Sequence, residues 1–324
     1  MKELEFSPEK VAVYSEELLK PEGVLCAIGN TPLVEIKKLN PNPQVKIFAK
    51  LEGANPAGSV KDRIAYFIIK EALITGKLEQ EKVVVEATSG NTGIGLGMVC
   101  SYYGIRLKLF MPECVSKERK TILRAFGAEL VLTPSEEGVD GAINRARELA
   151  EKEPEKYFLA NQYDNPANLN AHFYTTGKEI WEQTKGEITH FITSIGTTGT
   201  LMGVARRLKK HKPEIKIYAV EPEPGHSIQG LKSLSESYIP AIWNPAIVND
   251  VLKVKDQDAV YWVERLAKEE GIFVGLSSGA SLYGAIELAK SAPSGSIIVT
   301  VFPDRGDRYL STSFFRSICA KCPP

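Results

Sequence analysis

The chain has 324 residues, of which 43% are hydrophobic and 25% charged, which is typical of a globular protein with about two domains. Lysine and arginine together number 40, as do aspartate and glutamate, so the formal net charge is zero. This balance argues against nucleic-acid or anionic-membrane partners, which need a basic patch, and no apolar run is long enough to span a bilayer. The charged N-terminal segment lacks the apolar core of a signal peptide, so a cytoplasmic location is expected.

Segments typical of strands and helices alternate along the chain. Strands are expected over residues 45–52, 82–87, 105–112, 128–134, 189–196, 216–222 and 295–303. Helices are expected over 60–76, 93–104, 116–128, 142–154, 201–211 and 258–271, after a helical or irregular extension over residues 1–24. This alternation predicts an α/β fold with mostly parallel sheets and right-handed crossovers. Functional sites in such folds lie at the carboxyl ends of the strands.

The loop after strand 82–87 is rich in glycine and small polar residues. The polar ones are Thr88, Ser89, Asn91 and Thr92. At the start of a helix, their hydroxyls and the backbone N–H groups suit an anion such as a carboxylate. A plain turn is the alternative, whereas the glycine spacing does not match a dinucleotide fingerprint.

A second glycine-rich loop follows strand 189–196 and also leads into a helix. It consists of Gly196, Thr197, Thr198, Gly199 and Thr200. Glycines let the backbone approach a ligand closely, and the hydroxyls add donors, so this loop suits a phosphate. It lacks the lysine of a Walker A loop, which argues against hydrolysis of a nucleoside triphosphate. A third loop places Ser277 and Ser278 before a helix, either to bond a ligand or to cap that helix.

Lys61 follows the turn Gly58-Ser59, at the start of the predicted helix 60–76. The helix dipole and desolvation in a cleft should both lower the pKa of its amine. An amine combined with a phosphate loop points to pyridoxal 5'-phosphate, which forms an imine with lysine and needs an anchor for its phosphate.

The five cysteines are too few for a disulfide scaffold and fit a reducing compartment. Cys319 and Cys322 form a Cys-x-x-Cys pair near the C-terminus, but a metal site needs about four ligands. We therefore expect no metal site.

The motifs "NPAGSVKDR", "TSGNTG", "GTTGT" and "GLSSGA", in this order, resemble those of the cysteine synthase and cystathionine β-synthase family of fold type II pyridoxal-phosphate enzymes. The resemblance runs from about residue 29 to 315 and implies two three-layer α/β/α domains, as in the tryptophan synthase β subunit. It implies a smaller substrate-binding domain over 50–165 and a larger cofactor-binding domain over 25–49 and 166–324. A homodimer is also implied.

The resemblance assigns a role to each motif. Lys61 matches the lysine that forms the imine, and Gly196 to Thr200 match the phosphate loop. Asn91 matches the residue that bonds the cofactor's ring hydroxyl, and Ser277 the serine that faces the pyridine nitrogen. The substrate carboxylate is assigned to Thr88, Ser89, Asn91, Thr92 and Gln162.

The activity implied by the resemblance is β-replacement through an α-aminoacrylate. It would make L-cysteine from O-acetyl-L-serine and sulfide, or S-sulfocysteine from thiosulfate. The alternative is a lyase that eliminates or replaces the β substituent of cysteine, serine or O-phosphoserine. The cofactor motifs are the same for both reactions.

Overall fold

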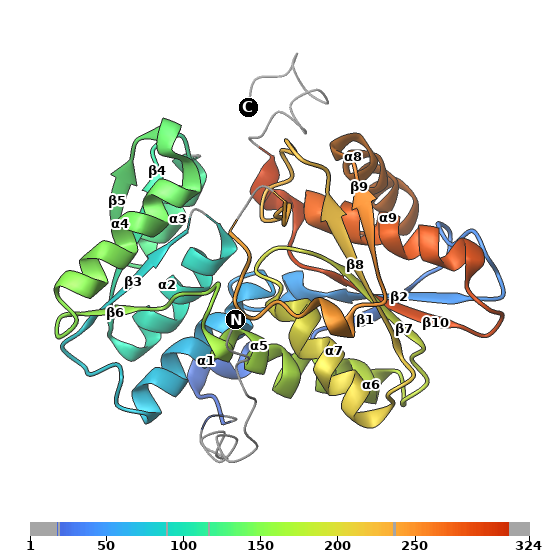
Figure 1. Cartoon of the computed structure of the whole chain (residues 1–324), viewed down its shortest axis with the longest axis horizontal. Coiled ribbons are helices and arrows are strands. Elements are labelled where there is room, and N and C mark those ends of the chain that lie inside the picture. The colour runs from blue at the N-terminus through green and yellow to red at the C-terminus, as the bar shows by residue number, and fades with distance from the viewer. Residues whose placement is uncertain (1–17, 19, 89, 116, 236–237, 311–324) are drawn as a thin grey trace. The chain divides into compact units, whose positions relative to one another are not determined.

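A computed structural model describes residues 18, 20–88, 90–115, 117–235 and 238–310, which form two compact units (Figure 1). Unit 1 comprises Met1–Ile28 and Ile64–Asn161, and unit 2 comprises Gly29–Arg63 and Gln162–Pro324. This division differs from the bounds that the resemblance implies at residues 25–28, 50–63 and 162–165, and the assignment of a substrate-binding and a cofactor-binding domain stays a prediction. Of the predicted extension over 1–24, only Leu18 and residues 20–24 are described, and Cys319 and Cys322 lie outside the described residues.

Unit 1 is built around a fully parallel four-stranded sheet in the order β5-β4-β3-β6. Its strands are β3 Val83–Ala87, β4 Arg106–Pro112, β5 Glu129–Thr133 and β6 Tyr157–Leu159. Its helices are α1 Lys61–Ile74, which begins in unit 2, and α2 Asn91–Tyr103, α3 Lys117–Ala125 and α4 Gly138–Lys152. All five residues of β3 are buried, as expected for a parallel strand covered on both faces.

Unit 2 contains a six-stranded sheet in the order β1-β2-β10-β7-β8-β9. Only the β1–β2 pair is antiparallel. The strands are β1 Leu33–Ile36, β2 Lys46–Leu51, β7 His190–Ser194, β8 Lys216–Pro222, β9 Asp250–Val254 and β10 Ile297–Phe302. The helices are α5 Pro166–Ala171, α6 Gly177–Gln183, α7 Gly199–His211, α8 Asp256–Arg265 and α9 Leu276–Ser291.

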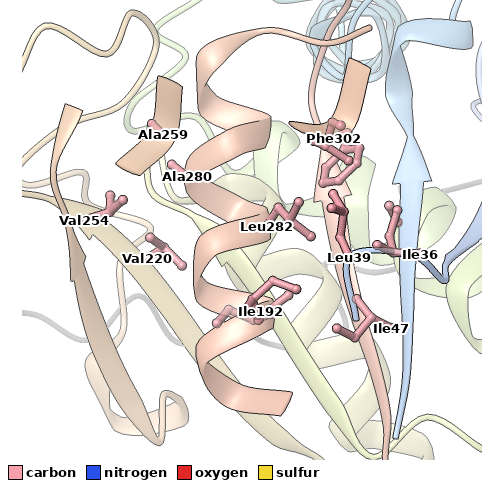
Figure 2. Close-up of a cluster of buried hydrophobic side chains, with 14 of the residues drawn as sticks. Ile36, Leu39, Ile47, Ile192, Val220, Val254, Ala259, Ala280, Leu282 and Phe302 are labelled. Atoms are coloured by element: carbon pink, nitrogen blue, oxygen red, sulfur yellow. The ribbon is translucent and has the colours of Figure 1, made fainter. Parts of the chain in front are cut away.

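Alternate residues on the central strands of unit 2 serve two separate cores. Ile192 of β7 and Ile298 of β10 pack in a cluster with α9. Their neighbours Phe191 and Val299 pack in a second cluster with α7. Figure 2 shows the first cluster, with strand residues beside Leu282 of α9. Unit 2 is therefore a three-layer α/β/α unit, and the predicted α/β fold with mostly parallel sheets is confirmed.

Some elements differ from their predicted bounds. The helix expected over 258–271 is α8, which ends at Arg265 and continues as a π-helical segment, Leu266–Glu270. The short elements β1, β6, β9, α5 and α6 were not predicted. Within the described ranges, no helix is both long and apolar enough to cross a membrane.

Candidate active site

The loop between β7 and α7 is held in an unusual backbone conformation. Thr198, just before α7, has φ of +65°, a left-handed conformation that is rare for a β-branched residue. Strain of this kind collects at functional sites, where surrounding contacts enforce it. The Oγ1 atom of Thr198 is buried and has no hydrogen-bond partner among the described residues. A buried hydroxyl without a partner at a helix start suits an anion that is bound there.

Both glycines of this loop are required by close packing. A Cβ atom on Gly196 would lie 2.6 Å from the carbonyl oxygen of Gly230. A Cβ atom on Gly199 would overlap the side chain of Asn168. A larger residue at either position would displace the loop, which explains why glycine occupies both.

Lys61 is the first residue of α1, and its backbone N–H donates to the Ser59 hydroxyl at 3.2 Å. Its amine lies 3.3 Å from the hydroxyl oxygen of Thr197. Part of the side chain remains exposed, yet its surroundings are dense enough that desolvation lowers the pKa of Lys61 to about 8. Desolvation of the amine is therefore the cause of the lowered pKa. The structure brings together the predicted lysine and the predicted phosphate loop.

The turn before Lys61 is fixed from both sides. The backbone N–H of Ala57 donates to Asp62 at 2.6 Å, and its carbonyl accepts a hydrogen bond from Arg308. The backbone N–H of Val60 donates to the carbonyl of Pro303 at 2.8 Å. These contacts hold the backbone before Lys61 in one conformation and so fix the position from which its side chain extends.

Ser277 lies in the first turn of α9, close to the end of β7. Its carbonyl accepts a hydrogen bond from the Ser194 hydroxyl at 3.3 Å. Ser278 is fully buried, and its hydroxyl has no hydrogen-bond partner among the described residues. The start of α9 and the end of β7 are therefore adjacent. The role of Ser277 toward a pyridine nitrogen stays a prediction.

The predicted carboxylate loop belongs to unit 1. Thr88 follows β3, and its hydroxyl accepts a hydrogen bond from the backbone N–H of Gly90 at 3.2 Å. Asn91 and Thr92 form the first turn of α2, where Thr92 is buried. Ser89 lies outside the described residues. The geometry agrees with a polar loop at a helix start, and the carboxylate role stays a prediction.

Two residues beside the phosphate loop were not singled out from the sequence. Asn168 of α5 is fully buried and donates to Thr197 at 3.0 Å and to the carbonyl of Gln162 at 2.7 Å. His172 is also buried, with Nε2 3.2 Å from the hydroxyl of Thr200. Burial, with the charges of Arg63 and Lys61, lowers the pKa of His172 well below its usual value. Asparagine and histidine within a helix carry no local signal for such contacts, which depend on packing.

The residues present suit pyridoxal phosphate. A phosphate is a dianion that accepts hydrogen bonds, and this loop offers threonine hydroxyls at the N-terminus of α7. The Oγ1 atom of Thr198 lacks a partner within the described chain, as such a ligand would require. An amine with a lowered pKa lies within hydrogen-bond distance of Thr197.

Comparison with known proteins gives consistent matches. The family model described as "Pyridoxal-phosphate dependent enzyme" matches residues 24–304. The chain is 52% identical to a cysteine synthase of Aquifex aeolicus over 302 residues, covering 91% of this chain and 92% of that relative. It is 47% identical to cysteine synthase B of Salmonella typhimurium, with coverages of 89% and 94%. The crystal structure of a cysteine synthase from Entamoeba histolytica superposes with a TM-score of 0.87, at 39% identity and coverages of 92% and 91%.

Proposed function

Because this chain belongs to the pyridoxal-phosphate dependent enzyme family, we propose that it makes L-cysteine from O-acetyl-L-serine and sulfide by β-replacement. The observation that carries this proposal is the contact between the amine of Lys61 and Thr197 of the glycine-rich loop. It joins a nucleophilic amine to an anion-binding helix start, which is the pairing that this cofactor needs. The similarity of this chain to cysteine synthases supports O-acetylserine as the substrate.

Binding of the cofactor is assigned to the residues of the predicted motifs. The segment Gly196 to Thr200 would hold the phosphate, Ser277 would face the pyridine nitrogen, and Asn91 would bond the ring hydroxyl. When bound, pyridoxal phosphate supplies an aldehyde that captures amines and a ring system that withdraws electrons from the substrate's α carbon. A neutral hydroxyl at Ser277 would leave the ring nitrogen without a counter-charge, which favours elimination at the β carbon over transamination.

The substrate carboxylate would be bound by the polar loop after β3 and by Gln162. The loop residues are Thr88, Ser89, Asn91 and Thr92. At the start of α2, backbone N–H groups and hydroxyls can together neutralise one carboxylate. This binding would hold the α C–H bond in one orientation and keep water away from the reacting carbons.

Lys61 would act as the base and acid of the reaction. Its amine takes the proton from the α carbon while the C–O bond at the β carbon breaks and acetate leaves. Sulfide then forms the new C–S bond, and Lys61 returns a proton to the α carbon, giving L-cysteine. With a pKa of about 8, the amine of Lys61 is partly unprotonated near neutral pH and can serve as this base.

We further propose a homodimer in the cytoplasm. The motif resemblance implies the homodimer, and the sparse cysteines support a reducing compartment. Sedimentation of the purified protein would test the assembly.

The activity itself is tested by product analysis. The protein is incubated with O-acetylserine and sulfide, and L-cysteine and acetate are quantified. Equal amounts of both products, with little pyruvate, would support β-replacement. Pyruvate and ammonia as the main products from cysteine, serine or O-phosphoserine would instead show the lyase activity. Thiosulfate in place of sulfide tests whether S-sulfocysteine also forms.

A further inference from the structure

We propose that Asn168 is a positioning residue that orients the Thr197 hydroxyl so that its proton points to the cofactor phosphate. This inference rests on the proposed function, because it assumes that the loop between β7 and α7 binds that phosphate. It concerns a residue of α5 that is absent from the three glycine-rich motifs. Its side chain donates to Gln162 and Thr197, and it would act on the phosphate through Thr197.

The orientation of the Asn168 amide is fixed by its surroundings. Its Nδ2 atom lies 2.7 Å from the backbone carbonyl oxygen of Gln162. A carbonyl oxygen only accepts hydrogen bonds, so the amide must present its NH₂ group there. A flipped amide would place two oxygens against each other inside the protein. The same NH₂ group therefore also donates to Thr197 Oγ1, at 3.0 Å.

The Thr197 hydroxyl then has a single direction left for its proton. A hydroxyl oxygen accepts two hydrogen bonds and donates one. Asn168 occupies one acceptor position, and the amine of Lys61 lies 3.3 Å away at the other. Thr197 donates to none of the described residues within hydrogen-bond distance. Its proton is available for an acceptor outside the protein, and a phosphate oxygen is such an acceptor.

Packing keeps this arrangement rigid. Asn168 has no exposed surface, and its side chain occupies the space next to Gly199 that any larger residue there would need. One amide proton of Asn168 is bonded to the carbonyl of Gln162, which holds the side chain in place. The other amide proton is bonded to Thr197 and orients its hydroxyl. A hydroxyl oriented in advance loses no rotational freedom when the phosphate binds, which strengthens binding.

The first test uses Asn168→Asp, which has nearly the same shape but replaces the donor by an oxygen. Thr197 would then donate to the carboxylate rather than to the phosphate. We expect the cofactor-free variant to bind pyridoxal phosphate at least about tenfold more weakly, measured by absorbance titration. Pyridoxal, which has no phosphate, should bind to the variant and to the native protein with the same affinity. Asn165→Asp is the matched control, because it makes the same change on the N-cap of α5, where the oxygen that accepts from Ala167 is kept.

The second test removes the charge from the comparison. Asn168→Leu and Thr197→Val should each weaken binding of pyridoxal phosphate, while their combination should be no weaker than Thr197→Val alone. In the holoenzyme, Asn168→Leu should also shift the ³¹P resonance of the bound phosphate. Thermal unfolding monitored by circular dichroism shows whether each variant is folded.

Three results would overturn the inference. These are unchanged affinity in the folded Asn168 variants, equal losses for pyridoxal and its phosphate, and additive losses in the double variant. If such a variant still makes cysteine at the native rate, the proposed function stands and the inference alone fails. If the native protein binds no pyridoxal phosphate, both fail.

Discussion

Arg63 and Glu52 form a two-pronged ion pair that is completely buried in unit 2. Nε of Arg63 lies 2.7 Å from Oε2 of Glu52, and Nη2 lies 2.8 Å from Oε1. The same guanidinium donates to Glu179 at 2.6 and 2.8 Å, and Lys50 lies 2.8 Å from Glu179. Burial alone would raise the pKa of Glu179, but hydrogen bonds and charge from Arg63 hold it at about 2. This cluster of two cations and two carboxylates holds α1 in place at Arg63, two residues after Lys61.

Arg63→Met should strongly destabilise unit 2, because it leaves two buried carboxylates with only Lys50 to balance them. We expect a loss of about 3–5 kcal/mol in the free energy of unfolding. Urea unfolding can be followed by tryptophan fluorescence, since Trp181, Trp243 and Trp262 all belong to unit 2. Lys290→Met, which removes an exposed ion pair with Glu287, is the control and should change little. Equal losses for the two variants would contradict this account.

Lys61→Met should stabilise the cofactor-free protein at neutral pH. The pKa of Lys61 is about 8 in the folded state and near 10.5 when exposed, so below pH 8 folding buries a charged amine at a cost. The unfolded chain binds more protons between pH 8 and 10.5, so native stability rises with pH across this range. We expect the variant to be about 2–3 kcal/mol more stable at pH 7, and this advantage to vanish near pH 10.5. A constant difference across this range would refute the lowered pKa.

Asp62→Asn should change the pH dependence in the opposite direction. Desolvation raises the pKa of Asp62 to about 7, despite the hydrogen bond from Ala57 and the charge of Arg308. The folded state binds the extra proton between pH 3.8 and about 7, so this group's contribution to stability decreases as pH rises through that window. The variant should therefore gain roughly 3 kcal/mol relative to the native protein between pH 4 and 7. Parallel stability curves, measured by urea unfolding, would show that Asp62 titrates normally.

Gly199→Ala should impair cofactor binding more than folding. The added methyl group would overlap the Asn168 side chain, so the loop or the asparagine must move. We expect at least about tenfold weaker binding of pyridoxal phosphate, because the hydroxyls of the loop lose their alignment. Absorbance titration measures the affinity, and circular dichroism measures the fold. Native affinity in this variant would show that the close contact is not needed.

The sequence predicted the elements whose patterns are local. The buried strand β8 was expected at its observed bounds, and the helix after Lys61 was expected within two residues of its end. The three-residue strand β6 and the four-residue strand β1 have too few residues to show a period. Gly196 to Thr200 were recognisable because glycines and hydroxyls next to a strand carry a local signal. Asn168 and Arg63 were not, since their partners Thr197 and Glu179 are distant in sequence and are brought close only by packing.

The most direct test of the central claim is the visible absorption spectrum of the purified protein with pyridoxal phosphate, before and after O-acetylserine and then sulfide. We predict an imine band that depends on Lys61, changes when O-acetylserine is added and returns when sulfide follows. Lys61→Ala should lack this cycle. An imine band that O-acetylserine leaves unchanged would contradict the proposed substrate, and the absence of any imine band would contradict the assignment of Lys61.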